Sequence, residues 1–192
     1  AFIENALIEL GHSVAVYSSP HITQFNERLR LNKVNVVDKP LVDAFEQIER
    51  ARGDISLTYY EYTTLAALLV IMAQTPEFVV LEVGLGGRLD ATNIIDADIA
   101  VVTTVDLDHQ AFLGDNRESI GFEKAGIFRP NGIAVIGDLH PPQSVISHGK
   151  SLQTNMFIRQ ADFHVDVEEA MAAWHWQDAT LHVKNLPLPH IP

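Results

Sequence analysis

The stretch EVGLGGRLDATN, residues 82–93, constrains most strongly what this chain can fold into. It follows the apolar run of residues 78–81, and a short apolar run bounded by turn residues predicts a buried strand of a parallel sheet. Such a strand delivers Glu82 to its carboxyl end, where the glycine-rich loop begins. Because open α/β sheets bind their ligands at that edge, we expect the stretch to belong to a site.

The remainder of the chain alternates between the two kinds of secondary structure. Apolar periodicity predicts helices at 2–10, 40–52, 58–73, 117–127 and 143–153, and strands at 13–17, 78–82, 99–103 and 133–136. This alternation predicts an α/β fold with a doubly wound, mainly parallel sheet. Short alternating runs after Asn155 predict a small antiparallel β element. We therefore expect one α/β domain over 1–154 and a small β subdomain with a connector over 155–192.

The composition excludes several classes of function. A chain without cysteine has neither disulfides nor a thiolate metal site, which fits the cytoplasm. A net charge of −12 argues against a nucleic-acid surface. No apolar stretch reaches the ~20 residues of a membrane span, so no contact with a membrane is expected. An acidic protein can still bind anionic substrates through local cations, helix N-termini or Mg²⁺.

The opening stretch contains two carboxylates with different candidate roles. An acid directly after four apolar residues, like Glu82, is how many phosphoryl-transfer enzymes hold Mg²⁺; a helix cap or an ion pair with Arg88 is the alternative. Asp90 could accept two N–H donors from a planar heterocycle, although an isolated aspartate of this kind more often caps a turn. The glycines between them either let backbone N–H groups approach a ligand or form a plain turn.

A second candidate cluster, VDLDH, spans residues 105–109 and follows the strand predicted at 99–103. It is therefore expected at the same edge of the sheet. Ligand chemistry alone favours Asp106 or Asp108 for Mg²⁺, which prefers oxygen. His109 remains open as a metal ligand, an acid–base group or a structural histidine.

Two further side chains have a functional and an ordinary interpretation. A helical lysine beside a glutamate, as in Glu123-Lys124, is typical of a solvated pair, whereas a buried functional amine requires a lowered pKa. Ser19 follows the first strand and offers a hydroxyl to a metal or simply forms part of a turn.

Taken together, the motifs resemble the bifunctional dihydrofolate synthase/folylpolyglutamate synthase family, a branch of the Mur ligase superfamily. The resemblance covers nearly the whole chain and is carried by four segments in order: YSSPHITQFNERLR (17–30), DISLTYYEYTTLAAL (54–68), LEVGLGGRLDATNIIDADIAVVTTVDLDH (81–109) and GDNRESIGFEKAGIFR (114–129). It implies that residues 1–154 are the P-loop NTPase-like central domain of such an enzyme.

The resemblance also implies an activity. Members of this family are ATP- and Mg²⁺-dependent ligases that add L-glutamate to dihydropteroate and to folates. The substrate carboxylate attacks the γ-phosphate of ATP, and the amine of glutamate then attacks the acyl phosphate. The implied partners are therefore dihydropteroate, folates, L-glutamate and ATP.

By motif position, Ser19, Glu82 and His109 match the family's Mg²⁺ ligands, which replaces the preference for the neighbouring aspartates. Lys124 matches a lysine that the family carbamylates with CO₂, turning a cation into an anionic ligand of a second metal. His109 and Lys124 are thus implied to be catalytic. The matching pterin-binding residues are Asp90, Ala91, Thr58 and Tyr60, the last at a position where phenylalanine is common.

Departures from the family pattern define the alternatives. The phosphate loop with its lysine is expected before residue 1 and a C-terminal domain after residue 192, so both ends are expected to be cut, 187–192 to be an unfinished connector, and the fragment to be inactive alone. Gln110 stands where a threonine is usual. The alternatives are another Mur-type amide ligase acting on a cell-wall precursor, and a non-catalytic folate-binding domain. The DATN and TYYEY motifs favour folate.

Overall fold

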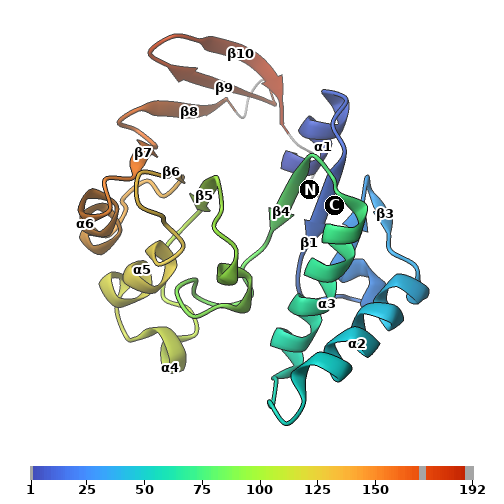
Figure 1. The fold of residues 1–192 in the computed structure, drawn as a ribbon. Helices are drawn as coiled ribbons and strands as arrows, with labels where there is room; N and C mark the ends of the chain where they lie inside the picture. The colour runs from blue at the N-terminus through green and yellow to red at the C-terminus, as the bar shows by residue number, and fades with distance from the viewer. Residues whose placement is uncertain (1, 169–171, 189–192) are drawn as a thin grey trace. The chain divides into compact units, whose positions relative to one another are not determined.

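The computed structural model of the chain describes residues 2–168 and 172–188, in which strands and helices alternate along most of the sequence (Figure 1). The α/β class predicted from the sequence is confirmed. The chain forms two compact units, Ala1–Leu85 with Asp90–Ile95, and Gly86–Leu89 with Asp96–Pro192.

The first unit is built on a four-stranded sheet of order β3-β2-β1-β4. Its central strand β1 (Val14–Tyr17) runs parallel to β4 (Phe78–Leu81) and antiparallel to β2 (Leu29–Leu31), which in turn pairs with β3 (Val34–Asn35). The helices of this unit are α1 (Phe2–Glu9), α2 (Asp38–Arg52) and α3 (Tyr59–Gln74), with short 3₁₀ turns η1 (Phe25–Arg28) and η2 (Ala91–Ile94).

The core of the first unit lies between this sheet and helices α2 and α3. Ala66 and Ala67 on α3 are fully buried, and such small side chains allow the helix to approach its neighbours closely. Tyr17 is also fully buried, and its hydroxyl lies 3.2 Å from Thr63 Oγ1 and 3.1 Å from Thr64 Oγ1. These contacts give hydrogen-bond partners to the three hydroxyl groups that the otherwise apolar core encloses.

Two sequence expectations are wrong in this unit. Strand β4 was expected to be buried, yet Phe78 is 40% and Val79 44% exposed, because β4 is an edge strand of the four-stranded sheet. No helix or strand was predicted over residues 18–32, yet they contain η1 and β2. A strand as short as β2, with Arg30 between two leucines, offers too few positions for a periodic signal.

The second unit contains a parallel sheet of order β5-β6-β7, formed by β5 (Ile99–Val102), β6 (Ile133–Ile136) and β7 (Asn155–Ile158). Strand β7 was not predicted. Helices α4 (Gln110–Leu113), α5 (Arg117–Ala125) and α6 (Gln143–Ser151) accompany the sheet. Asn116 caps α5, because its side chain accepts a hydrogen bond from Ser119 N.

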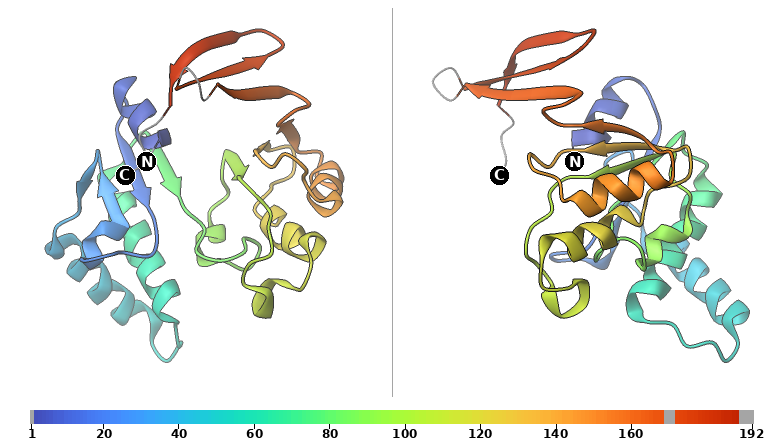
Figure 2. Two further views of the ribbon diagram at one scale, coloured as in Figure 1. Left: turned by 180° about the vertical axis from the view of Figure 1, so that it is seen from behind. Right: turned by 90° about the vertical axis from the view of Figure 1, so that its left-hand side faces the viewer.

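The predicted antiparallel element is confirmed as a sheet of order β10-β9-β8 (Figure 2). It consists of β8 (Phe163–Glu168), β9 (Ala173–Asp178) and β10 (His182–Pro187). Asp178 closes the hairpin by accepting hydrogen bonds from Thr180 N at 2.7 Å and Leu181 N at 2.8 Å. Of the expected connector, residues 189–192 lie outside the described part.

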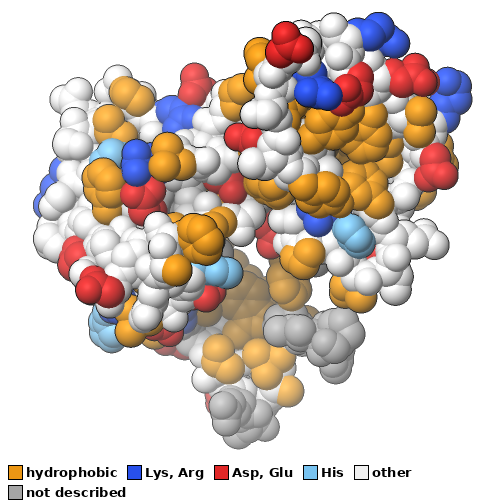
Figure 3. Space-filling view, turned by 90° about the horizontal axis from the view of Figure 1, so that it is seen from below, with side chains coloured by type: hydrophobic (Ala, Val, Ile, Leu, Met, Phe, Trp, Pro, Cys, Tyr) orange, Lys and Arg blue, Asp and Glu red, His pale blue; other side chains and the backbone are white. Residues whose placement is uncertain are grey.

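Hydrophobic side chains reach the surface beside charged ones (Figure 3). In the second unit, β5 alternates between exposed Ile99 and Val101 and buried Ala100 and Val102, so one face of that strand is covered and the other is open.

Within residues 2–168 and 172–188, no helix has the length and apolar character needed to cross a membrane.

Candidate functional site

Ser19 and Glu82 lie at the same edge of the first sheet. Strands β1 and β4 are parallel with Tyr17 opposite Leu81, and Glu82 N donates to Tyr17 O at 2.9 Å. Glu82 is the first residue after β4 and Ser19 is the second residue after β1. The Glu82 carboxylate is exposed and has no hydrogen bond or ion pair with any residue that the structure describes. Its oxygens are therefore available to a cation.

The loop that carries Ser19 is shaped by Glu27, a residue outside the predicted site. Its carboxylate accepts hydrogen bonds from Ile22 N at 2.7 Å, Thr23 N at 3.1 Å and Gln24 N at 2.8 Å, as well as from the Thr23 hydroxyl. The Thr23 hydroxyl first, and then these backbone groups, lower the pKa of Glu27 to about 2. Gln24 and Glu27 have the spacing of a capping box, and this sequence signal could have identified Glu27.

A buried arginine holds the same loop from its other side. Arg28 Nε donates to His21 Nδ1 at 2.8 Å, and the guanidinium lies 6.0 Å from the ring centre of Phe25 and 5.4 Å from that of Tyr59. Ring contacts of this kind partly compensate a cation for the loss of water. Because Arg28 also accepts Ser18 N through its carbonyl, the chain on both sides of Ser19 is fixed.

Asp90, predicted to contact a pterin, is engaged in its own loop. One carboxylate oxygen accepts from Gly84 N at 3.0 Å and Leu85 N at 2.9 Å. The other accepts from Thr92 N at 2.9 Å and Thr92 Oγ1 at 2.6 Å. A carboxylate has about four lone-pair sites, so the loop itself occupies the acceptor capacity that a heterocycle would use. Asp90 is thus the N-cap of η2, which is the turn-capping role more common for an isolated aspartate of this kind.

Tyr60 packs directly against the glycine-rich stretch. A Cβ at Gly84 would lie 2.6 Å from the ring Cζ of Tyr60, so only glycine permits this contact. The Tyr60 hydroxyl is enclosed and makes no hydrogen bond of good geometry with the described residues. Burial, and then the negative charge of Asp90, raise the pKa of Tyr60 to about 12, against the smaller opposing influence of the nearby Ser19 side chain. Thr58, the N-cap of α3, accepts from Glu61 N at 3.2 Å.

Gly87 of the opening stretch and Gly126 permit a close approach between backbones in the second unit. Arg88 N donates to Glu123 O at 2.8 Å, at the C-terminal end of α5. A Cβ at Gly87 would lie 2.8 Å from that same carbonyl oxygen, and a Cβ at Gly126 would lie 2.3 Å from Arg88 Cβ. Residues 86–89 therefore cap α5.

The ion pair at this contact joins Glu123 to Arg88 instead of to its sequence neighbour Lys124. Arg88 is paired with Glu123 at 2.9 Å. Glu123 consequently does not form the solvated pair with Lys124 that its position suggested. The half-buried ammonium of Lys124 makes no hydrogen bond or ion pair within the described residues. The amine is therefore available for chemistry.

His109 belongs to the second unit and begins α4. It adopts the left-handed conformation with φ +48°, and its N–H donates to Asp108 Oδ1 at 2.7 Å. Its exposed imidazole Nε2 is 3.6 Å from Asp108 Oδ2. Asp106 in turn accepts from Leu107 N at 2.8 Å, so both aspartates of this segment shape its backbone.

The predicted metal ligands are thus divided between the units, Ser19 and Glu82 in the first, His109 and Lys124 in the second. Among the described residues there is no group of three or more histidines, aspartates and glutamates placed to hold a metal. Of the four predicted metal ligands, only Glu82 and His109 are of those residue types. The predicted ligand set is therefore not tested in this way and stays a prediction.

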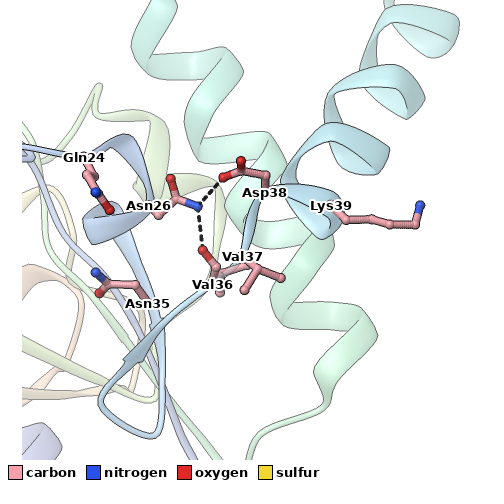
Figure 4. A pocket seen from close by; sticks show the side chains of 7 residues that line it. All are labelled: Gln24, Asn26, Asn35, Val36, Val37, Asp38 and Lys39. Carbon is pink, nitrogen blue, oxygen red and sulfur yellow. Dashed lines mark hydrogen bonds between the residues drawn. The ribbon is translucent and has the colours of Figure 1, made fainter.

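The first unit also has an open hollow of about 540 Å³ (Figure 4). Asn26 Nδ2 bridges its wall by donating to Val36 O at 2.7 Å and Asp38 Oδ1 at 2.9 Å. None of the predicted site residues is among those that line it: Gln24, Asn26, Asn35, Val36, Val37, Asp38 and Lys39.

Comparison with known proteins identifies the family. Residues 21–183 match the family described as Mur ligase middle domain. The chain belongs to the Mur ligase family. It is 44% identical over 190 residues to the dihydrofolate synthase/folylpolyglutamate synthase of Escherichia coli strain K12, covering 99% of this chain and 44% of that protein. The chain thus spans less than half the length of the curated relatives it matches.

Solved structures of similar proteins agree with the fold. E. coli FolC in complex with DHPP and ADP superposes with a TM-score of 0.95 at 44% identity, covering 99% of this chain and 45% of that one. A bifunctional folylpolyglutamate synthase/dihydrofolate synthase with Mn, AMPPNP and L-glutamate bound superposes with a TM-score of 0.91 at 43% identity, covering 99% and 46%. The resemblance drawn from the sequence motifs is confirmed.

The enclosed hydroxyl of Tyr60 generates a stability prediction. A buried polar group without a partner costs about 1–3 kcal/mol, so Tyr60→Phe should leave the free energy of unfolding unchanged or raise it by up to about 1 kcal/mol. Tyr62→Phe is the matched control on the same helix, because the Tyr62 hydroxyl donates to Phe45 O at 3.1 Å. The free energy of unfolding of Tyr62→Phe should fall by about 1 kcal/mol. Urea denaturation measures the free energy of unfolding of both variants. Equal losses would contradict the interpretation that the Tyr60 hydroxyl lacks a hydrogen-bond partner.

Proposed function

We propose that the protein containing this chain is an ATP- and Mg²⁺-dependent ligase that adds L-glutamate to dihydropteroate and to folate polyglutamates through an acyl phosphate. The observation that carries the proposal is the 44% identity to the E. coli enzyme, which extends over 99% of this chain and therefore over every predicted site residue. The relatives solved with ADP or with Mn, AMPPNP and L-glutamate support a nucleotide, a divalent metal and glutamate as ligands.

The local chemistry of the first unit fits a divalent cation. Ser19 offers a hydroxyl at the end of one of two adjacent parallel strands, and Glu82 at the end of the other offers a carboxylate that has no partner among the described residues. Mg²⁺ prefers such oxygen ligands, and at this edge of the sheet it would neutralise charge on the transferred phosphoryl group. His109 would add an imidazole. Lys124, once carbamylated, would add oxygen ligands for a second ion, and its lack of a competing ion pair within the described residues supports this role.

The pterin would contact the same unit. Tyr60 and Thr58 begin helix α3, and Asp90 and Ala91 lie in the loop that Tyr60 packs against through Gly84. Since Asp90 already accepts four hydrogen bonds, pterin donors there would have to share or displace the bonds from Gly84 N and Leu85 N. We propose that Asp90 both shapes this loop and faces the pterin.

A different Mur-type amide ligase is the second candidate, supported by the family match alone. A non-catalytic folate-binding domain is the third. The cytoplasmic location expected from the lack of cysteine belongs to the same set of proposals.

A substrate-exchange assay on the full-length protein tests the function. ADP release should depend on dihydropteroate plus L-glutamate and on a divalent metal, and it should be absent when a UDP-linked cell-wall precursor replaces dihydropteroate. Turnover with the UDP-linked substrate alone would favour the second candidate. Folate binding without ADP release under any condition would favour the third.

Substituting Lys124 tests the carbamate. Lys124→Ala in the full-length protein should lower kcat by at least about 100-fold, since removing a group that stabilises charge in the transition state costs about 10²–10³ in rate. Small carboxylic acids should restore part of the activity by supplying the missing oxygens. Arg52→Ala, which removes a half-buried cation that pairs with Glu49 in the first unit, is the control. Turnover like that of the wild type, without rescue, would contradict the role.

Substituting Asp90 separates its two roles. Asp90→Ala should weaken binding of dihydropteroate far more than binding of ATP, and should also lower the free energy of unfolding by about 1–3 kcal/mol because the loop's bonds are lost. Thr92→Val is the matched control, since it removes one bond to Asp90 and keeps the carboxylate. Calorimetric titration measures both ligands. An equal loss of pterin affinity in Thr92→Val would mean that loop shape alone matters.

A further inference from the structure

A carboxylate that no sequence motif indicated, Asp138, joins two loops of the second unit. It follows β6 and is only 5% exposed. One of its oxygens accepts from Val105 N at 2.7 Å, in the loop after β5, and the other accepts from His140 N at 2.8 Å. The loops at the carboxyl ends of two adjacent parallel strands are therefore cross-linked through a single side chain.

Arg117 on the first turn of α5 completes this junction. Its Nε donates to Val105 O at 2.8 Å, and its terminal nitrogen donates to His140 O at 3.0 Å and to both Asp138 oxygens at 3.1 and 3.2 Å. Both backbone groups of the buried Val105 are thus held by one ion pair. Burial alone would raise the pKa of Asp138, but the donors from Val105, His140 and Arg117 outweigh it and lower that pKa.

The chain between this junction and His109 is short and internally bonded. Leu107 N donates to Asp106, and His109 N donates to Asp108. Beyond His109, the carbonyl of this residue accepts from Leu113 N at 3.1 Å, and Leu113 is buried against the backbone of Gly86. His109 therefore sits between two anchored points, Val105 on one side and Leu113 on the other.

We propose that the Asp138–Arg117 pair is a positioning device for His109. By fixing the peptide groups of Val105, the pair sets where the loop presents the imidazole to a divalent metal ion. Neither residue touches the metal in this proposal; both act through the loop. The metal-binding part rests on the proposed function, whereas the control of the loop stands on the hydrogen bonds of this unit.

The test compares Asp138→Asn with Asp178→Asn. Asp178 is a matched control because it also accepts two backbone N–H groups at 2.7 and 2.8 Å, but in the β9–β10 hairpin. Two quantities are measured on the full-length protein: Mn²⁺ affinity by titration, and amide hydrogen exchange of residues 105–109. Asp138→Asn should weaken Mn²⁺ binding roughly tenfold, the lower end of the loss when groups that orient ligands are removed. It should also accelerate exchange at residues 105–109. Asp178→Asn should change neither.

Activity provides a third measurement. With Asp138→Asn the Mn²⁺ concentration for half-maximal activity should rise by a similar factor, while kcat at saturating Mn²⁺ largely recovers. Arg117→Lys keeps the charge but loses the fork to Val105 O and His140 O, and should show a smaller shift of the same kind. If Asp138→Asn fails to fold, Arg117→Lys carries the comparison.

Equal thermal destabilisation of Asp138→Asn and Asp178→Asn, with Mn²⁺ affinity and exchange at 105–109 unchanged, would overturn the proposal, since the pair would then serve stability only. A wild-type protein without ligase activity would refute the proposed function separately. In that case exchange at 105–109 still decides whether the pair holds the loop.

Discussion

The parallel pairing of β1 with β4 is the constraint on which the first half of the site depends. With Tyr17 opposite Leu81, both strands end at the same level, and the residues that follow them emerge at one edge. Ser19 and Glu82 come together for this reason although 63 positions separate them in the sequence. The pairing needs the buried side chains of β1, and Tyr17 adds hydrogen bonds to α3 that hold the helix carrying Tyr60 against the same strand.

What the glycine-rich stretch does was only partly predictable. Its place after a strand and its mixture of glycine, acid and base indicated a site. The sequence did not reveal that residues 86–89 leave the first unit and cap the end of α5, because that contact depends on the carbonyl of Glu123 and the small size of Gly126, some 35 residues further on. Local patterns contain no information on which helix end a loop will approach.

Helices and strands were predicted well where the apolar periodicity is strong, and poorly where tertiary contacts determine the local structure or its burial. Helix α3 and strand β6 follow from their apolar patterns. The exposure of β4 could not be predicted, because an edge strand and a central one have the same composition when the apolar run is short. Likewise Asp138 resembles any aspartate in a turn until Arg117 and Val105 are seen around it. The roles of Ser19, Glu82, His109 and Lys124 came from family resemblance, since each alone had an ordinary alternative.

A common physical device underlies the loops at these strand ends. Glu27, Asp90, Asp138 and Asp178 each accept two or more hydrogen bonds from backbone or hydroxyl groups of loops, and Asp138 accepts them from two different loops. Part of the net charge of −12 is therefore internal scaffolding that fixes polar backbone in place of regular secondary structure. For Glu27, Asp138 and Asp178 these bonds hold the folded-state pKa below its ordinary value. Their contribution to stability is accordingly present above the unfolded pKa and is lost as the pH falls through the folded pKa. The order of the candidate site is thus tied to ionised carboxylates, the same chemical state that a divalent metal requires of Glu82.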